Sequence, residues 1–563
     1  MESKKYLSKN HKGWFIKIKK LSNEIEIIPG NIEYDSEMLD FGNRVLYTDQ
    51  AYFIIFDGSL LNNISKDELL SVMIDGKQKD DVSFLKNFNG CFSGIIIDWN
   101  KQDILCFADR IGSRQVYYAD LSNEIIISSD IASIYDYMND SNITNTLDIS
   151  SAYSLLSCGY LQENNTLSTL VKRIIPGSTL LIKGNVQEIP YYSLDNTPKQ
   201  VTMDEAIEMV EHHFTNACNL QYSSILNWGG YLVALSGGLD SRMTSLIGHD
   251  LGYTKQLNMT FSQSGYSDQI IAQQISSDYN HDWLFKSLDS GRYLMDIDIA
   301  TEYSGGSVLY YMSVHSNSMF SLLNLKNFGM YHTGQLGDVV LGTYYSGQDP
   351  NKPYDYSSGA FSQKLIKKID KPRKQYPNEE IGKFYNRGFN GIIMAGGCIT
   401  NHRLENFSPF LENQFLETCL HFPLSLRFDH KLYKEWIIRK HPEIAKYKWE
   451  KINARITTPS IIIKGRSFPI TDITRRIRNK VKHTLFPDKD LLMTKFHMNP
   501  LAWHIHNNPE VGKFINDYIK DNMTLLSDKE LNEDVGKLAS SSNSIERLQA
   551  ISLLAAIKRF NFK

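Results

Sequence analysis

YLVALSGGLDS, residues 231–241, is a short apolar strand that runs directly into a glycine-rich turn. A helical pattern follows the turn and ends near Gly252. The same order then repeats, with a strand at 257–261 and a helix from about 267 to 276. Alternating strands and helices are typical of a parallel sheet covered by helices, so we predict an α/β fold for this part of the chain.

The turn itself, Ser236–Ser241, carries groups that suit a phosphate. Gly237 and Gly238 let the backbone approach a phosphate closely, and the helix start supplies N–H donors with partial positive charge. Asp240 would repel phosphates unless Mg²⁺ bridged them, which makes it a candidate Mg²⁺ ligand. The alternative is a glycine-rich strand–helix turn without a ligand. We favour the ligand because a strand precedes the turn and a helix follows it.

A second acidic group comes from TGQLGDVVLGTY, residues 333–344. Asp338 lies 98 residues after Asp240, so only the fold can bring the two carboxylates together. Two carboxylates at a pyrophosphate site are reasonable joint ligands of Mg²⁺, which prefers oxygen. Taken alone, the segment could be any glycine-containing turn. As a partner of Asp240 we interpret it as functional.

The rest of the chain divides by pattern. Residues 1–200 are β-rich, with short apolar runs separated by Gly, Asn and Asp turn signals; the runs lie at 52–56, 93–98, 103–108 and 124–128. A polar stretch at 195–200 suggests a domain boundary near residue 200, and the pattern is mostly helical from about residue 360.

Composition limits the classes of protein. The chain has 563 residues, which is too long for one core and indicates two or three domains. Hydrophobic residues make up 42% and the formal net charge is -3, so the chain is neither mostly disordered nor a polyanion binder, and we expect no nucleic-acid partner. Six cysteines without a CxxC pair fit a reducing compartment. No apolar run reaches the ~18–20 residues of a membrane span, so we expect a cytoplasmic protein with no transmembrane segment.

Several motifs in order resemble one known family. Ser236–Ser241 resembles the PP-loop of ATP pyrophosphatases. FADRIGSRQVYY at 107–118, preceded by GCF at 90–92, is similar to the glutaminase-domain signature of asparagine synthetases, and SPFLE at 408–412 is similar to an element of their synthetase domain. The resemblance to the asparagine synthetase family extends from about residue 45 to about residue 455.

The resemblance implies a fold of mixed α/β and α+β class. Residues 1–200 would form a degenerate glutamine-amidotransferase-like domain, an αββα sandwich of the N-terminal nucleophile (Ntn) type. Residues 201–460 would form a parallel-sheet PP-loop synthetase domain, and residues 461–563 a helical C-terminal extension. A weaker feature is a basic amphipathic pattern at 472–485, which we interpret as a solvated helix rather than a membrane-binding one.

The resemblance also implies a reaction in which ATP adenylates a carboxylate, pyrophosphate leaves, and an amine attacks the acyl-adenylate. Mg²⁺ would be held by Asp240 and Asp338. A late lysine would stabilise charge on the α-phosphate, and Lys451 is the best candidate, although Lys446 and Lys448 are close by. The ATP-holding residues would be Leu235, Ser236, Gly237, Gly238, Asp240, Ser241, Phe261, Thr333 and Gly334.

Departures from the family pattern concern both reactions. Family glutaminases begin with a nucleophilic cysteine after the initiator Met, where this sequence has Glu2, and their oxyanion-hole Asn is Asp57 here. We therefore expect no glutaminase activity. In the synthetase part, a Glu that serves intermediate formation and amine deprotonation is Gln335, which cannot act as a base. Substitution at this position also occurs in the family's cyclising relatives, the β-lactam synthetases and lasso-peptide cyclases.

We therefore expect an ATP- and Mg²⁺-dependent amide ligase that adenylates a small-molecule or peptide carboxylate, such as aspartate. The amine would be ammonia or a group on the substrate. The alternatives are a cyclase or peptide-modifying ligase, amidation of a sugar acid in glycan synthesis, and a non-catalytic nucleotide-binding protein. The sequence does not decide the oligomeric state, and a homodimer is one alternative. The intact Ser236–Ser241 and Asp338 favour an enzyme.

Overall fold

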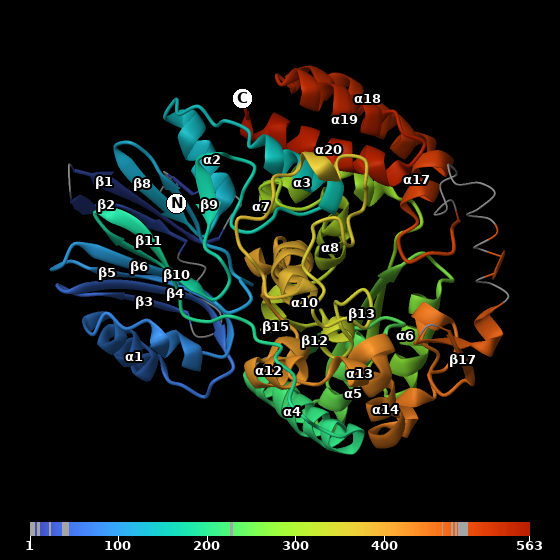
Figure 1. Ribbon diagram of the computed structural model, residues 1–563. Helices are drawn as coiled ribbons and strands as arrows, with labels where there is room; N and C mark the ends of the chain where they lie inside the picture. Colours follow the sequence, from blue (N-terminus) through green and yellow to red (C-terminus); the bar gives the residue numbers. More distant parts are fainter. Residues whose placement is uncertain are drawn as a thin grey trace.

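The structure is a computed structural model that describes residues 6–7, 12–21, 24–35, 44–225, 229–463, 465–473, 477–478, 481 and 494–563. Two antiparallel sheets and one parallel sheet form its framework, with helices around them (Figure 1). The antiparallel sheets come from the first 190 residues, and the parallel sheet lies in the middle of the molecule.

The N-terminal part is a sandwich of two antiparallel sheets. One sheet has the order β2-β1-β8-β7-β9 and the other β11-β10-β6-β5-β4-β3. The strands are β1 Trp14–Lys20, β2 Ile25–Tyr34, β3 Val45–Thr48, β4 Tyr52–Leu60, β5 Gly90–Asp98, β6 Asp103–Ala108, β7 Tyr117–Asp120, β8 Glu124–Ser128, β9 Val171–Arg173, β10 Ser178–Lys183 and β11 Asn185–Pro190.

Alternation of side chains along these strands produces the layers. Ile16 on β1, Ile55 on β4 and Ile95 on β5 point between the sheets and belong to one buried core, because successive residues of a strand face opposite sides. The outer faces are covered by helices α1 Lys66–Gln78, α2 Ile131–Asp140 and α3 Ile149–Cys158. The predicted αββα arrangement is therefore present.

The central sheet is parallel in every pairing, with the order β14-β13-β12-β15-β16. Its strands are β12 Tyr231–Ala234, β13 Gln256–Ser262, β14 Asp282–Ser287, β15 Met330–His332 and β16 Glu405–Phe407. Helices α4 Met203–Ser223, α5 Leu239–Asp250, α6 Ser267–Asp278, α7 Ile297–Ser304 and α8 Val314–Phe320 surround it. The strands predicted at 231–235 and 257–261 and the helices after them are confirmed.

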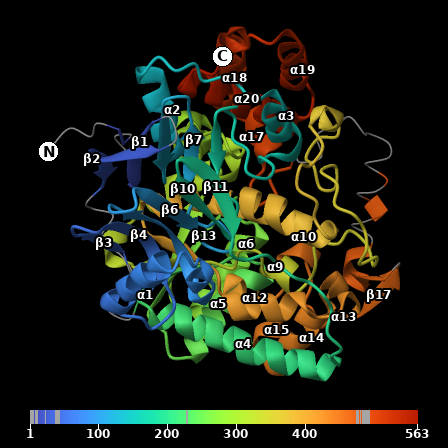
Figure 2. The same cartoon turned by 60° about the vertical axis from the view of Figure 1, so that its left-hand side comes forward.

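The chain after β15 forms short helices, and from about residue 360 it is mostly helical, as predicted. These are α9 Gly337–Val340, α10 Glu379–Lys383, the π-helix η7 Phe384–Ile393, α11 Met394–Gly397, α12 Asn413–Leu420, α13 Leu424–Arg427, α14 Lys431–Lys440 and α15 Pro442–Ala445. A hairpin of β17 Ser460–Ile463 and β18 Arg466–Pro469 follows and lies beside α14 (Figures 1 and 2). Most of the basic pattern at 472–485 lies outside the described residues.

Four helices complete the chain: α17 Leu501–Asn507, α18 Pro509–Asn522, α19 Lys529–Ala539 and α20 Ser544–Phe560. α20 is buried along most of its length and shares one apolar core with α2, α3 and α7. The C-terminal helices therefore pack on the sandwich and the central part together. None of the described helices combines the length and the apolar character that crossing a membrane requires.

The boundary predicted near residue 200 falls between β11 and α4, where the chain has no regular secondary structure. The division into three domains with ends at 200 and 460 stays a prediction. The shared core of α20 shows that the last helices are packed onto both preceding parts.

Candidate active site

The glycine-rich turn lies at the carboxyl end of β12 and opens α5. Its hydroxyls hold it in shape: the Ser236 N–H donates to Ser241 Oγ (3.0 Å) and the Gly238 N–H donates to Ser236 Oγ (3.1 Å). The Gly237 N–H donates to the buried Asp268 carboxylate (2.7 Å). The turn is therefore fixed before any ligand binds, as an anion site at a helix start requires.

At two positions, Gly237 and Gly334, neighbouring segments lie so close that only glycine fits. A Cβ on Gly237 would lie 2.8 Å from Glu450 Cβ, and a Cβ on Gly334 would lie 2.5 Å from the backbone of Asp240. The second contact shows that the segment after β15 passes directly against the start of α5. Glycine at 334 is what permits the two loops to meet.

Asp240 and Asp338 come together as the sequence predicted. The Asp338 N–H donates to Asp240 Oδ2 (3.0 Å), and the Tyr433 hydroxyl donates to Asp240 Oδ1 (3.0 Å). Burial, and after it the charge of Asp338, raise the pKa of Asp240 to about 8. Two neighbouring carboxylates in such a place favour a cation between them.

A cavity of about 500 Å³ opens beside these groups. Most predicted residues line it: Leu235, Ser236, Gly238, Asp240, Ser241, Phe261, Thr333, Gly334, Gln335 and Asp338. Gly237 does not, because its face is turned to Asp268 and Glu450. Sequence reasoning missed other lining residues, which carry no motif: Met259, Met312, His315, Tyr331, Gly396, Thr400, Asn406 and Met498.

Lys451 lies in a single 3-10 turn, Glu450–Ile452, outside the lining of this cavity. Its Nζ is 3.7 Å from Asp338 Oδ2 and 3.5 Å from His430 Nε2. Burial, and after it the charges of Lys451 and Lys434, lower the pKa of His430 to about 3, so the ring is neutral and can accept a hydrogen bond from the lysine. Lys446, in contrast, lies 3.9 Å from Asp278.

Gln335 occupies the end of the cavity that faces α11. Its side chain lies against Gly396, where a Cβ would be 1.9 Å from Gln335 Nε2. Its own carbonyl accepts from Ser408 Oγ (2.9 Å), and Leu336 after it has a left-handed backbone (φ 64°). The amide can donate and accept hydrogen bonds here but cannot remove a proton from an amine.

The position of the oxyanion-hole Asn is occupied by an ionic cluster of four buried side chains. Asp57 contacts Arg44 (2.8 Å) and Arg114 (3.4 Å), and both arginines also contact Glu405 on β16, each at 2.9 Å or less. Burial raises the pKa of Asp57, but the charges of Arg114 and Arg44 outweigh it and hold the pKa below its ordinary value. The carboxylate stays ionised, so it would repel a developing oxyanion.

The space beside this cluster is small, about 60 Å³. Cys91, on β5, is buried with its Sγ 3.4 Å from the carbonyl of Asn406. Burial, and after it the charge of Asp109, raise the pKa of this thiol well above its ordinary value. A thiol held in this way supplies little thiolate for attack on glutamine.

Comparison with known proteins agrees with this arrangement. Residues 67–192 match the model of the glutamine amidotransferase domain. A stretch of 274 residues is 23% identical to asparagine synthetase [glutamine-hydrolyzing] 1 of Bacillus subtilis, covering 46% of this chain and 42% of that protein. A stretch of 166 residues is 24% identical to amidase chry2 of Gibberella zeae, covering 28% of this chain and 23% of that protein. The matches span less than half of these relatives.

Two solved structures are also similar. One is glutamine phosphoribosylpyrophosphate amidotransferase from B. subtilis with ADP and GMP, at 10% identity and a TM-score of 0.21, covering 46% of this chain and 61% of that one. The other is an allosteric regulatory enzyme of purine biosynthesis, at 8% identity and a TM-score of 0.22, covering 49% and 74%. These scores are too low to establish a shared overall fold.

The sandwich and the domain match define an amidotransferase-type N-terminal part joined to a parallel-sheet α/β part. Together with the match to the B. subtilis enzyme, this makes the chain similar to asparagine synthetases over about half of its length.

Proposed function

We propose that the protein is an ATP-dependent amide ligase that adenylates a carboxylate and releases AMP and pyrophosphate when an amine attacks. The observation that carries this proposal is the convergence of Asp240 and Asp338 beside the glycine-rich turn, with the Lys451 ammonium 3.7 Å from Asp338. Paired carboxylates, hydroxyl donors and a lysine suit a Mg²⁺-bound triphosphate, because the carboxylates would hold the cation while the hydroxyls and the lysine face the phosphates.

ATP would bind with its nucleoside in the cavity and its phosphates along the turn. Leu235, Phe261 and Thr333 with Gly334 would surround the nucleoside, together with Met259 and Tyr331. The hydroxyls of Ser236 and Ser241 would donate to the phosphates, and Gly238, whose N–H is bonded to Ser236 Oγ, would let the backbone approach them. Gly237 would contribute only by permitting the tight turn, because its N–H is bonded to Asp268.

Asp240 and Asp338 fit a bound Mg²⁺. Each Asp240 oxygen accepts one hydrogen bond and keeps a lone pair, while Asp338 is exposed enough to take part. When bound, Mg²⁺ would neutralise charge on the phosphates. Tyr433 and the Asp338 N–H would hold the Asp240 carboxylate in position.

In the reaction, an oxygen of the acceptor carboxylate attacks the α-phosphorus, and the bond to the bridging oxygen breaks, so that pyrophosphate carries away the electron pair. Lys451 would stabilise the charge that develops. The amine then attacks the acyl carbon, AMP leaves, and the amine proton goes to a base other than Gln335. The acceptor would be aspartate or a related acid.

A second candidate is an amide-forming cyclase or peptide-modifying ligase. The Arg44–Asp57–Arg114–Glu405 cluster favours it, because the cluster removes the route from glutamine-derived ammonia. The neutral Gln335 favours it because an amide cannot deprotonate the incoming amine as the family's Glu would. An amine carried by the substrate needs no such route. Amidation of a sugar acid by free ammonium is a variant of the first function.

Pyrophosphate release from ATP is the direct test. The full-length protein, supplied with Mg²⁺, ammonium and a panel of carboxylates, should release pyrophosphate, and Asp338→Asn should lower the rate by about 100-fold or more. Asp282→Asn is the matched control, since Asp282 is exposed at the opposite end of the same sheet. Release that is absent with every acceptor, although ATP binds, would point to a nucleotide-binding protein instead.

A further inference from the structure

A second cavity, of about 270 Å³, is lined by Lys451, which does not line the first cavity. It is bounded by the segment that begins α14 and by the β17–β18 hairpin. Its lining is Thr343, Tyr345, Phe428, Asp429, His430, Lys434, Trp449, Lys451, Ile452, Ile456, Ser460, Arg466, Ser467, Phe468 and Pro469.

The charges of this lining are unbalanced. Lys434, Lys451 and Arg466 are cationic, and Asp429 is the single carboxylate among the lining residues. Asp429 is engaged by Lys434 Nζ (3.1 Å) and the Ser467 N–H (2.9 Å). Arg466 contacts no carboxylate among the residues that the structure describes; its guanidinium donates to the Ser346 carbonyl (3.3 Å). The cavity therefore carries a net positive charge that suits an anion.

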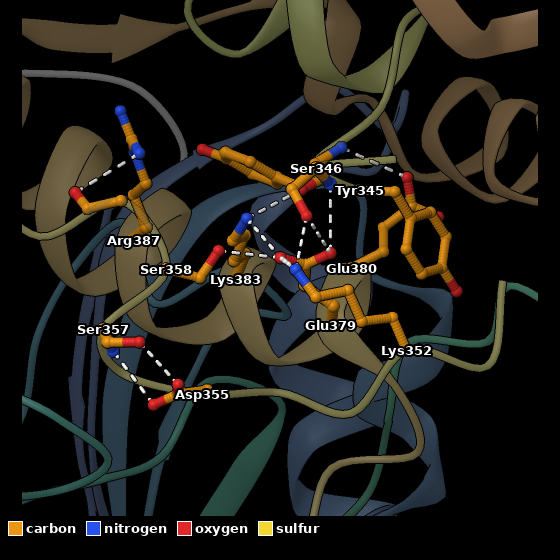
Figure 3. Close-up of polar contacts among 12 residues, drawn as sticks. Tyr345, Ser346, Lys352, Asp355, Ser357, Ser358, Glu379, Glu380, Lys383 and Arg387 are labelled. Atoms are coloured by element: carbon orange, nitrogen blue, oxygen red, sulfur yellow. Dashed lines mark hydrogen bonds and ion pairs between the residues drawn. The ribbon is translucent and has the colours of Figure 1, made fainter. Parts of the chain in front are cut away.

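The walls are built to hold these cations in place. Ser346 is fixed by the buried Glu379, which accepts from the Ser346 N–H (3.0 Å) and pairs with Lys383 (2.8 Å) and Lys352 (3.1 Å), as Figure 3 shows. Asp429 and His430 both have left-handed backbones (φ 57° and 59°). Two such non-glycine residues in succession are costly and occur where surrounding structure demands them.

We infer that this cavity receives pyrophosphate as it leaves the α-phosphorus and holds it with Lys434, Lys451 and Arg466. The inference rests on the proposed function and names the fate of its first product. A series of contacts connects the turn to this cavity. Asp240, which belongs to the turn at Ser236–Ser241, contacts Asp338, Asp338 contacts Lys451, and Lys451 lines the cavity. Lys451, half exposed, lies 3.7 Å from Asp338 and also lines this cavity, so it would face the reacting phosphates and then the departing anion.

The step balances without a further reactant. Breaking the bond between the α-phosphorus and its bridging oxygen leaves both electrons on pyrophosphate, whose charge rises as it departs. The cavity lining has three cationic side chains and one carboxylate, Asp429, which is already paired with Lys434. Its excess positive charge would therefore stabilise the added negative charge of pyrophosphate. Trp449, Ile452 and Phe468 add apolar groups to the wall beside these cations.

Calorimetric titration of the full-length protein with pyrophosphate, with and without Mg²⁺, tests the inference. Lys434→Ala and Arg466→Ala should each weaken pyrophosphate binding by tenfold or more and raise the inhibition constant of pyrophosphate to the same degree. Lys431→Ala is the matched control, because it removes a lysine charge one turn away on α14 from an exposed position. Melting curves of all variants establish that each is folded.

The outcomes separate this inference from the proposed function. Pyrophosphate affinity unchanged in both variants would overturn the inference, even in a protein that turns over ATP. Binding that depends on Lys434 and Arg466 in a protein that releases no pyrophosphate would leave the anion site standing and refute the ligase. If aspartate bound with the same dependence, the cavity would hold the acceptor and the assignment to pyrophosphate would be wrong.

Discussion

At the scale of single residues, the site depends on charges whose neighbours fix their state. Asp240 is buried against Asp338 and Tyr433, and Lys451 is held between Asp338 and a neutral His430. In the proposed reaction, a lysine in this position would act on charge that develops during the reaction, since the ground-state triphosphate would already be held by the turn and by Mg²⁺ on the carboxylates.

Lys451→Ala should therefore lower kcat by about 100-fold while the affinity for ATP changes by less than about threefold. Lys448→Ala is the control, with no expected loss. Steady-state kinetics of pyrophosphate release and ATP titration measure the two quantities. Similar small losses from both variants would return Lys451 to the role of a surface lysine.

The N-terminal part should release no glutamate from glutamine, with or without ATP. All six cysteines are buried, and burial raises the pKa of each thiol, so none offers a ready thiolate. Glutamate release is measured beside Cys91→Ala. Activity lost only in that variant would identify Cys91 as a nucleophile, and activity kept there would require another one.

At the scale of elements, α10 fastens the segment that follows Asp338. Glu379 holds Ser346, Ser358, Lys352 and Lys383 (Figure 3). Its neighbour Glu380 pairs with Arg427 of α13 at 2.7 Å. These two carboxylates tie α9, α10 and α13 into one unit beside the candidate site.

Glu379→Gln should destabilise the protein by about 3 kcal/mol at pH 7, because Lys383 would stay buried without its partner. Burial raises the Glu379 pKa, but Lys383 and the other donors outweigh it and lower it to about 2 from its ordinary 4.5. A lowered carboxyl pKa stabilises the fold above pH 4.5, and this contribution is lost as the pH falls from 4.5 toward 2.

Urea unfolding from pH 7 down to the lowest pH at which the protein stays folded measures this effect. The gap between Glu379→Gln and wild type should narrow below pH 4.5. Glu435→Gln, which removes an exposed partner of Arg439, should cost less than about 1 kcal/mol at any pH. A gap that is independent of pH would show that the charge of Glu379 is not what stabilises the unit.

At the scale of the whole molecule, the Arg44–Asp57–Arg114–Glu405 cluster joins the sandwich to the parallel sheet. Breaking one member leaves uncompensated buried charge, so Glu405→Gln should lower the free energy of unfolding by about 3 kcal/mol. Glu417→Gln is the control, because that glutamate also bridges the two parts, through Arg110, but is half exposed. Equal effects in denaturant unfolding would mean that burial of the cluster does not matter.

The sequence by itself determined the parallel sheet, because strand–helix repetition marks one, and it marked the first 200 residues as β-rich through short apolar runs between turn signals. It placed β6 and β8 at their observed bounds and named ten of the residues that line the cavity beside Asp240 and Asp338, because glycine and acidic motifs are local signals. Only tertiary structure decided the rest. Met312, His315 and Asn406 carry no motif, since a cavity wall needs only shape from distant segments. The partners of Asp57 lie as far along the chain as Glu405, and the cations of the second cavity come from separate elements, so no local pattern could join them.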